Sequence, residues 1–168
     1  MKCYYVSGLD DRTAYLKFVQ YMTERSSSFS LVYFRYNSSE KLKKTCRSVK
    51  TDLASYKLFE KNVLKWPSME TRNENGHIYR LAMYRSVPEV ESVLARANSL
   101  WDWDYPALPM DLCFYKDGYA WFAASSHETW NCLYIDDANT AAEMRALGFV
   151  LTDEAKIDDT SVFYEKDL

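Results

Sequence analysis

Residues 99–133 read SLWDWDYPALPMDLCFYKDGYAWFAASSHETWNCL and contain four of the five tryptophans of the chain. Two apolar runs, Leu112–Tyr115 and Tyr119–Ala124, flank the tripeptide Lys116–Gly118, and this arrangement is typical of a β-hairpin with a tight turn. Cys132–Ile135 predicts a third strand soon afterwards. The stretch therefore predicts an antiparallel sheet at the centre of the fold.

The segments before this stretch predict helices and strands in alternation. Apolar residues at three- and four-residue steps indicate an amphipathic helix that follows a cap at Asp10 or Asp11 and ends near Arg25. Aromatic and β-branched runs predict strands at residues 1–7, 29–36 and 77–85.

Two further segments before residue 99 carry less regular patterns. A basic helix is expected from Ser38 or Ser39 to Val49; its lysines form a solvated face, with a contact to phosphate or an acidic partner as the alternative. Residues 51–64 fit either a helix or a strand.

Ser86 and Glu89 form a capping box that predicts the start of a long helix. Pro88 lies in its first turn, where the missing N–H costs nothing. Apolar residues at helical spacing continue to Trp101, so the helix is expected to span residues 86–101.

After residue 135 the chain predicts one helix and a closing strand pair. The helix is capped by Asn139 or Thr140 and ends at Gly148, which suits a left-handed cap. The strands are expected at residues 149–151 and 162–164. Residues 1–168 thus form a single α+β domain: a mainly antiparallel sheet of about five to seven strands with three or four packed helices.

Composition excludes several classes of function. The net charge of −3 gives no electrostatic basis for binding duplex nucleic acid. No apolar run is long enough to cross a bilayer, and the N-terminus carries no signal-peptide pattern, so we expect a cytoplasmic protein. The four cysteines form no C-x-x-C pair and are expected to be free thiols. We expect no metal and no cofactor.

The sequence Ser125-Ser126-His127-Glu128 is the one compact group of residue types used in catalysis. A histidine can move protons near neutral pH, with Glu128 or Ser125 as its partner in a small hydrolase. However, adjacent residues on a strand point to opposite faces, so we expect His127 and Glu128 not to share a site. We therefore interpret them as architectural or recognition groups.

Aromatic and acidic residues surround this group along the chain. The rings either pack in the core or form a platform on which a base or sugar stacks. These rings are Trp101, Trp103, Tyr105, Trp121 and Trp130. Asp111 and its acidic neighbours are interpreted as solvated carboxylates and caps rather than cation ligands. With Ser126, His127 and Glu128, the rings and Asp111 are the predicted binding residues.

A longer pattern links these residues. It reads W-P, then L-x-x-W-x-x-P-x-L-P-x-D-L-C-F, then D-G-x-x-W and S-H-E, between Trp66 and Glu128. This pattern resembles that of a family of small uncharacterised bacterial and phage-encoded proteins, over about residues 60–135. The chain departs from it at Met110, where the family has glutamate, and at Ser68-Met69. The resemblance implies no activity.

We therefore expect a non-catalytic cytoplasmic binding protein that acts on a partner protein, of the immunity, defence or counter-defence kind. One alternative is a small hydrolase-like enzyme that uses His127 with Glu128 or Ser125. Another is a nucleotide or single-strand nucleic-acid binder that uses the tryptophan cluster. A small-molecule ligand also stays open. A cleft lined by His127, Glu128 and Trp103 would favour these alternatives over the partner protein.

Overall fold

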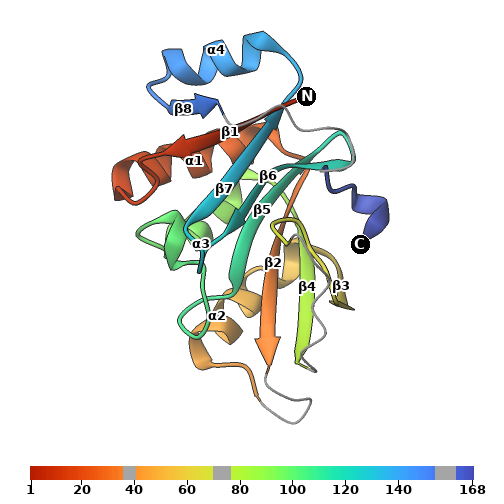
Figure 1. The fold of residues 1–168 in the computed structure, drawn as a ribbon. Helices are drawn as coiled ribbons and strands as arrows, with labels where there is room; N and C mark the ends of the chain where they lie inside the picture. Colours follow the sequence, from red (N-terminus) through yellow and green to blue (C-terminus); the bar gives the residue numbers. More distant parts are fainter. Residues whose placement is uncertain (36–40, 70–76, 154–161) are drawn as a thin grey trace.

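An eight-stranded antiparallel sheet forms the body of the protein in the computed structural model, which describes residues 1–35, 41–69, 77–153 and 162–168 (Figure 1). The strands are β1 (Lys2–Ser7), β2 (Ser28–Arg35), β3 (Lys57–Val63), β4 (Ile78–Arg85), β5 (Met110–Lys116), β6 (Tyr119–Ser125), β7 (Trp130–Ile135) and β8 (Val150–Asp153). Their order across the sheet is β3-β4-β2-β5-β6-β7-β1-β8, and each neighbouring pair is antiparallel.

Helices cover one face of this sheet. They are α1 (Arg12–Arg25), α2 (Lys44–Asp52), α3 (Glu91–Leu94) and α4 (Ala138–Ala146), and short 3₁₀ turns lie at Ala54–Tyr56, Pro88–Val90, Leu100–Asp102 and Glu165–Asp167. Each α-helix buries side chains in the same core cluster as the inner face of the sheet. We call this the helix face.

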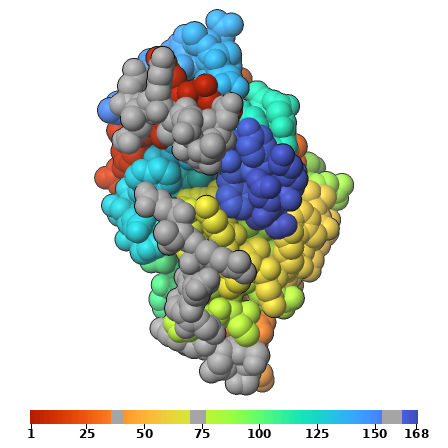
Figure 2. All heavy atoms as spheres, turned by 45° about the vertical axis from the view of Figure 1, so that its right-hand side comes forward, coloured from red at the N-terminus to blue at the C-terminus, as the bar shows by residue number. Residues whose placement is uncertain are grey.

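The opposite face of the sheet, which we call the open face, has a second, smaller core. Alternation along the strands divides the residues between the two faces. On β5, for example, Leu112 and Phe114 pack on the helix face, whereas Cys113 and Tyr115 pack on the open face. Trp66 and Val162, which lie outside the strands, also belong to the open-face core. In Figure 2 the C-terminal segment (dark blue) lies beside the surface of the β3 region (yellow), consistent with a hydrogen bond from the Lys61 ammonium to the Leu168 carbonyl.

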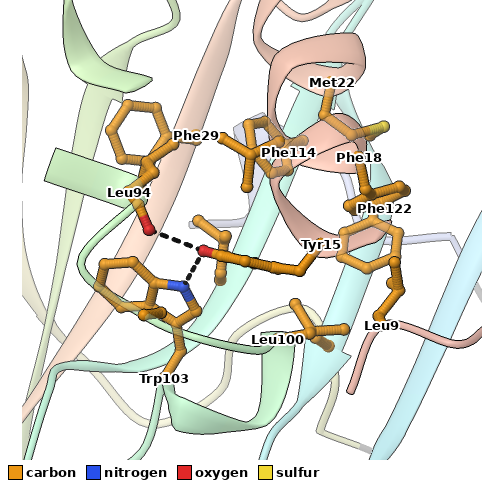
Figure 3. Packing of buried hydrophobic residues seen from close by; sticks show 14 of the residues in the cluster. Leu9, Tyr15, Phe18, Met22, Phe29, Leu94, Leu100, Trp103, Phe114 and Phe122 are labelled. Atoms are coloured by element: carbon orange, nitrogen blue, oxygen red, sulfur yellow. Dashed lines mark hydrogen bonds between the residues drawn. The ribbon is translucent and has the colours of Figure 1, made fainter. Parts of the chain in front are cut away.

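A buried polar chain crosses the helix-face core (Figure 3). The Trp103 indole N–H donates to the Tyr15 hydroxyl over 2.7 Å, and the Tyr15 hydroxyl donates to the Leu94 carbonyl over 2.9 Å. The Trp103 and Tyr15 side chains are completely buried. Burial raises the pKa of Tyr15, so its hydroxyl stays protonated and can donate. The chain joins α1, α3 and the connector before β5.

The expected α+β arrangement with a mainly antiparallel sheet is confirmed in outline, although the sheet has eight strands rather than five to seven. Asp11 caps α1 by accepting from the Ala14 amide over 2.9 Å. The hairpin turn between β5 and β6 has positive φ at Asp117 and Gly118, as a two-residue turn requires. Gly148 follows α4 with a φ of 89°, as a left-handed cap does.

The prediction of one long helix over residues 86–101 is wrong. The Ser86 hydroxyl donates to the Thr23 carbonyl instead of capping, and α3 ends at Leu94. Two interactions explain the early end. The Arg12 guanidinium donates to carbonyl groups at the end of α3, and the Asp102 carboxylate accepts from the Asn98 amide. Both satisfy backbone groups that a longer helix would have paired internally.

Other boundaries also differ from the expectation. α2 begins at Lys44, not at Ser38 or Ser39, which lie outside the described residues. The ambiguous segment 51–64 contains the end of α2, a 3₁₀ turn and strand β3. The cap of α4 is Asp137, which accepts from the Thr140 amide. The expected turn at residues 73–76 is not among the described residues.

The structure also corrects the predictions for the last strand pair and for the cysteines. β8 pairs with β1, while Tyr164 forms a bridge with Tyr119 instead of pairing with β8. Cys3 and Cys132 form a disulfide, in contrast to the expected free thiols. Their strands, β1 and β7, are neighbours, and their Cα atoms are 5.7 Å apart, a separation that suits the bond. Cys46 and Cys113 are free and buried.

Candidate functional site

A cavity of about 800 Å³ opens on the open face of the sheet. Five aromatic side chains line it, namely Phe34, Trp66, Tyr79, Tyr105 and Trp130. Six polar side chains also line it, namely Ser68, Asp104, Asp111, Ser125, His127 and Glu128. The described lining residues include no lysine and no arginine. The volume lies within the range of small-molecule sites, which is about 300–1,000 Å³.

The topology of the sheet gathers these residues at one end. Phe34, near the end of β2, pairs in register with Tyr79, near the start of β4. Ser125, at the end of β6, pairs with Trp130, at the start of β7. Because neighbouring strands run in opposite directions, the ends of some strands meet the starts of others at the same end of the sheet. The cavity therefore draws on β2 and β4 as well as on the consecutive strands β5, β6 and β7.

A β-bulge turns Asp111 into this site. Ser30 pairs with Cys113, but Val32 pairs with Met110, so β5 contains one extra residue between these two pairs. Asp111 takes up this irregularity with a φ of 58°, in the left-handed region. A bulge of this kind interrupts strict alternation and re-aims a side chain. As a result, both Met110 and Asp111, adjacent in the sequence, line the cavity.

The Asp111 carboxylate is buried and held by two donors. Its Oδ2 accepts from the Trp66 indole N–H over 2.8 Å, and its Oδ1 accepts from the Ser126 amide over 2.9 Å. The side chain is only 2% exposed. Burial raises the pKa of Asp111, and the two hydrogen bonds and the nearby His127 oppose that rise. Asp111 is thus a rigidly held carboxyl group in an apolar surrounding.

His127 and Glu128 lie in a loop, contrary to the expectation that they alternate along a strand. Residues 126–129 form the four-residue connection between the paired Ser125 and Trp130. The Thr129 amide donates to the Ser126 carbonyl and closes the turn. The two side chains are 61% and 62% exposed, and both line the cavity at its rim. The loop therefore brings them to one site.

The spacing within this group is loose for catalysis. The Ser125 Oγ lies 3.4 Å from the His127 Nδ1, and the His127 Nε2 lies 3.8 Å from the Glu128 Oε1. Catalytic proton transfer needs separations of about 2.6–3.2 Å. Ser125 itself is only 2% exposed, although it lines the cavity. The three side chains share the cavity without forming a tight relay.

Backbone strain concentrates around the cavity. Of the four described non-glycine residues with positive φ, Ser68 and Asp111 line the cavity, and Thr129 belongs to the loop of His127 and Glu128. The fourth, Asp117, lies in the β5–β6 turn. The buried Ser68 Oγ has no hydrogen-bond partner among the described residues. Strained residues that the surrounding structure holds in place are a recurrent feature of functional sites.

We expect Thr129→Gly to raise the stability of the protein slightly. Thr129 has a φ of 50°, which is unfavourable for a β-branched residue and free of cost for glycine. The relief of about 1–2 kcal/mol is partly offset by about 0.4–1 kcal/mol of added chain entropy in the unfolded state. Chemical denaturation measures the net change. A clear loss of stability would show that the Thr129 side chain contributes more than its strain costs.

The structure places the other predicted binding residues away from the cavity. Trp103 is buried in the helix-face core, and Trp101 packs partly against it. Trp121 is also buried and donates its indole N–H to the Ser26 hydroxyl. Ser126 is buried, and its amide holds Asp111. Of the predicted rings, Tyr105 and Trp130 line the cavity, whereas the other three lie elsewhere.

Sequence reasoning did not select several residues of the cavity. These are Phe34, Trp66, Ser68, Met69, Tyr79, Asp104 and Met110. One signal was present: Trp66 belongs to the W-P element of the longer pattern, so it could have been grouped with Asp111. Nothing in the sequence indicates that Phe34 and Tyr79 reach the same end of the sheet.

Two features are absent from the residues that the structure describes. No group of three or more His, Cys, Asp or Glu side chains is arranged to hold a metal ion there. No described helix is long and apolar enough to cross a membrane. The carboxylates of Asp102 and Asp137 accept hydrogen bonds from nearby backbone amides.

Comparison of the chain with family models, with curated proteins and with solved structures finds no match. The resemblance to the bacterial and phage family stays a prediction, and function has to be argued from the cavity itself.

Proposed function

We propose that the protein binds a ligand in this cavity and does not transform it. The observation that carries the proposal is the position of Asp111. Its carboxylate lines an aromatic cavity, in a strained backbone conformation, and is held by Trp66 and Ser126. Such a rigid arrangement reduces the ordering cost of binding, because the site is already formed.

The hydrolase alternative is less well supported by the geometry. The distances among Ser125, His127 and Glu128 exceed those of a working relay. The Ser126 amide, which follows Ser125, already donates to Asp111 and is not free to stabilise an oxyanion. We therefore assign these side chains to recognition at the rim.

The nucleotide alternative is also disfavoured. Asp104, Asp111 and Glu128 line the cavity, and no described lining residue is a lysine or arginine that could pair with a phosphate. The aromatic walls suit a flat or apolar body instead. A phosphate-bearing ligand would place like charges together at this site.

A partner protein remains part of the proposal. The sequence predicts a cytoplasmic partner protein of the immunity, defence or counter-defence kind. Such a partner can present the bound group on one of its own side chains. The same cavity then serves a free ligand or a partner-borne group, and affinity capture from the native host followed by mass spectrometry separates these two cases.

A fragment screen tests ligand binding directly. We expect small aromatic fragments to bind the wild-type protein in ligand-observed NMR and to bind Trp130→Ala about tenfold or more weakly, because a buried ring contributes about 1.5–3 kcal/mol. Trp101→Ala is the matched control, since Trp101 packs on the helix-face core. Equal binding to Trp130→Ala and wild type would contradict the proposal.

A second experiment separates binding from catalysis. His127→Ala and Glu128→Gln should weaken ligand or partner binding in step with the biological effect. If both variants stay folded and bind normally but lose the effect by orders of magnitude, the side chains act in catalysis and the binding proposal fails.

A further inference from the structure

We propose that the cavity selects an organic cation, an amine or guanidine carried on an apolar or aromatic body. This inference rests on the binding function proposed above and names the class of ligand. Three features carry it, namely the uncompensated carboxylate of Asp111, the acidic rim and the aromatic wall.

The first feature is that no lysine or arginine of the described residues forms an ion pair with Asp111. The described donors to its carboxylate, the Trp66 indole and the Ser126 amide, are both neutral. The nearby His127, which opposes the rise of the Asp111 pKa, has a mostly exposed side chain at the rim. Aspartates are rarely so buried unless they are paired with a positive charge. A cation in the cavity would supply that missing charge.

The Asp111 carboxylate keeps the capacity for this role. A carboxylate oxygen has two lone pairs, and each Asp111 oxygen accepts one hydrogen bond from the described residues. With respect to those residues, one lone pair on each oxygen is left for an ammonium or guanidinium donor. Burial raises the pKa of Asp111, because the charged form loses hydration there.

The second feature is the charge of the rim. Glu128 lies in the exposed loop between β6 and β7, and Asp104 lies in the connector before β5. Both line the cavity together with Asp111. Carboxylates gathered in a concave site raise the local concentration of cations and repel anions.

The third feature is a continuous aromatic wall. The Phe34 and Tyr79 rings stack with centroids 5.1 Å apart, and the Trp66 ring lies 5.0 Å from the Tyr79 ring. The Tyr105 ring meets the Phe34 ring edge-on at 4.9 Å. Aromatic faces carry negative charge density and attract cations, particularly where water is excluded. The wall therefore favours the same charge as the carboxylates and also accommodates an apolar body.

Matched ligands of different charge test the inference by calorimetry. Phenethylamine is a cation at neutral pH, 2-phenylethanol is neutral and phenylacetate is an anion, while their aromatic bodies are alike. We expect phenethylamine to bind about tenfold or more tightly than 2-phenylethanol, because hydrogen bonds to charged groups exceed neutral ones by that order. Phenylacetate should bind more weakly than either, and added salt should weaken phenethylamine alone.

Variants of the rim connect this selectivity to named residues. The double variant Asp104→Asn, Glu128→Gln should bind phenethylamine about two- to twentyfold more weakly, as the loss of two partly exposed charge pairs implies. Its affinity for 2-phenylethanol should be unchanged. Glu89→Gln, an exposed carboxylate on the helix face, is the control and should leave both affinities unchanged.

Trp130, the fifth aromatic ring that lines the cavity, tests the contribution of an aromatic face. Trp130→Phe retains such a face and should keep most of the preference for phenethylamine, whereas Trp130→Leu should lose about threefold or more of it. Agmatine and N-acetylarginine amide separate two sources of the cation. Tighter binding of agmatine supports a free small molecule, and tighter binding of the amide supports a protein side chain.

Two outcomes would overturn the inference, and they differ in what they leave standing. If 2-phenylethanol or phenylacetate binds as tightly as phenethylamine and depends on Trp130, the cavity binds ligands but does not select cations. If none of the five probes binds at millimolar concentration and the fragment screen is also empty, both the inference and the binding function fail.

Discussion

Trp103→Ala is expected to lower the free energy of unfolding by about 3–5 kcal/mol, the usual cost of removing a large buried ring. Trp103 is completely buried in the helix-face core, so the substitution leaves a cavity there. It also removes the indole donor of the Tyr15 hydroxyl, which bridges to the Leu94 carbonyl. Urea denaturation followed by circular dichroism measures the change.

Two further variants separate packing from hydrogen bonding at this position. Tyr15→Phe keeps the ring but leaves the buried Trp103 N–H without its acceptor and removes the donor hydroxyl of the Leu94 carbonyl, which keeps the Ala97 amide as a donor. We expect a loss of about 1–3 kcal/mol. Trp101→Ala, on a partly buried neighbour, should cost clearly less than Trp103→Ala. Similar losses for the two tryptophans would contradict the assignment of Trp103 as a core residue rather than a ligand-binding one.

Asp111→Ala should destabilise the protein by about 3–8 kcal/mol. It leaves the Trp66 indole N–H and the Ser126 amide without their acceptor, at about 1–3 kcal/mol for each buried group. It also places alanine at a φ of 58°, which costs about 1–2 kcal/mol. Thermal and chemical denaturation both measure the sum.

Asp111→Gly and Asp111→Asn divide this cost into its parts. Glycine adopts the left-handed region freely, so Asp111→Gly should be less destabilised than Asp111→Ala if the strain at the bulge is real. Asparagine also tolerates this region but keeps one acceptor, so Asp111→Asn should lose only about 1–3 kcal/mol. Equal stabilities of the alanine and glycine variants would contradict the strained bulge.

The pH dependence of stability provides an independent check on Asp111. Burial raises its pKa in the folded state above the ordinary value of 3.8. Between these two values the folded state binds more protons than the unfolded state, so this group makes stability fall as pH rises. Asp111→Asn removes that contribution. The stability of the wild type relative to Asp111→Asn should therefore decline as pH rises from about 4 towards neutral.

Local patterns in the sequence predicted those elements that are determined by residues close together in the chain. The turn at Asp117 and Gly118, the Asp11 cap and most strands depend on neighbouring residues and were predicted. The helix expected from Ser86 failed because Arg12 and Asp102, distant in the sequence, satisfy the chain around residues 95–98 instead. Tertiary contacts of this kind leave no periodic signal.

The candidate site shows the same limit. Ser125, His127, Glu128 and Asp111 were selected from the sequence, and the structure brings them to one cavity. The sequence did not predict that His127 and Glu128 face the same cavity, because residues 126–129 fit a four-residue loop and an extended strand equally well. The re-aimed Asp111 depends on a register shift against β2, and only the pairing of the two strands reveals it.

The position of β1 has a consequence for the speed of folding. Tyr4 lies opposite Leu133 on one side and Asp153 on the other, so this N-terminal strand completes the sheet only after most of the chain has been ordered. β5, β6 and β7 are joined by short connections and can pair early. Pairing β1 with β7 and β8 closes a long loop, and the chain loses this entropy before the new contacts stabilise the sheet. Antiparallel proteins rich in such distant pairs refold in about milliseconds to seconds. We expect the insertion of β1 between β7 and β8 to be the slow step in the reduced chain, in which the Cys3–Cys132 disulfide does not yet hold β1 to β7.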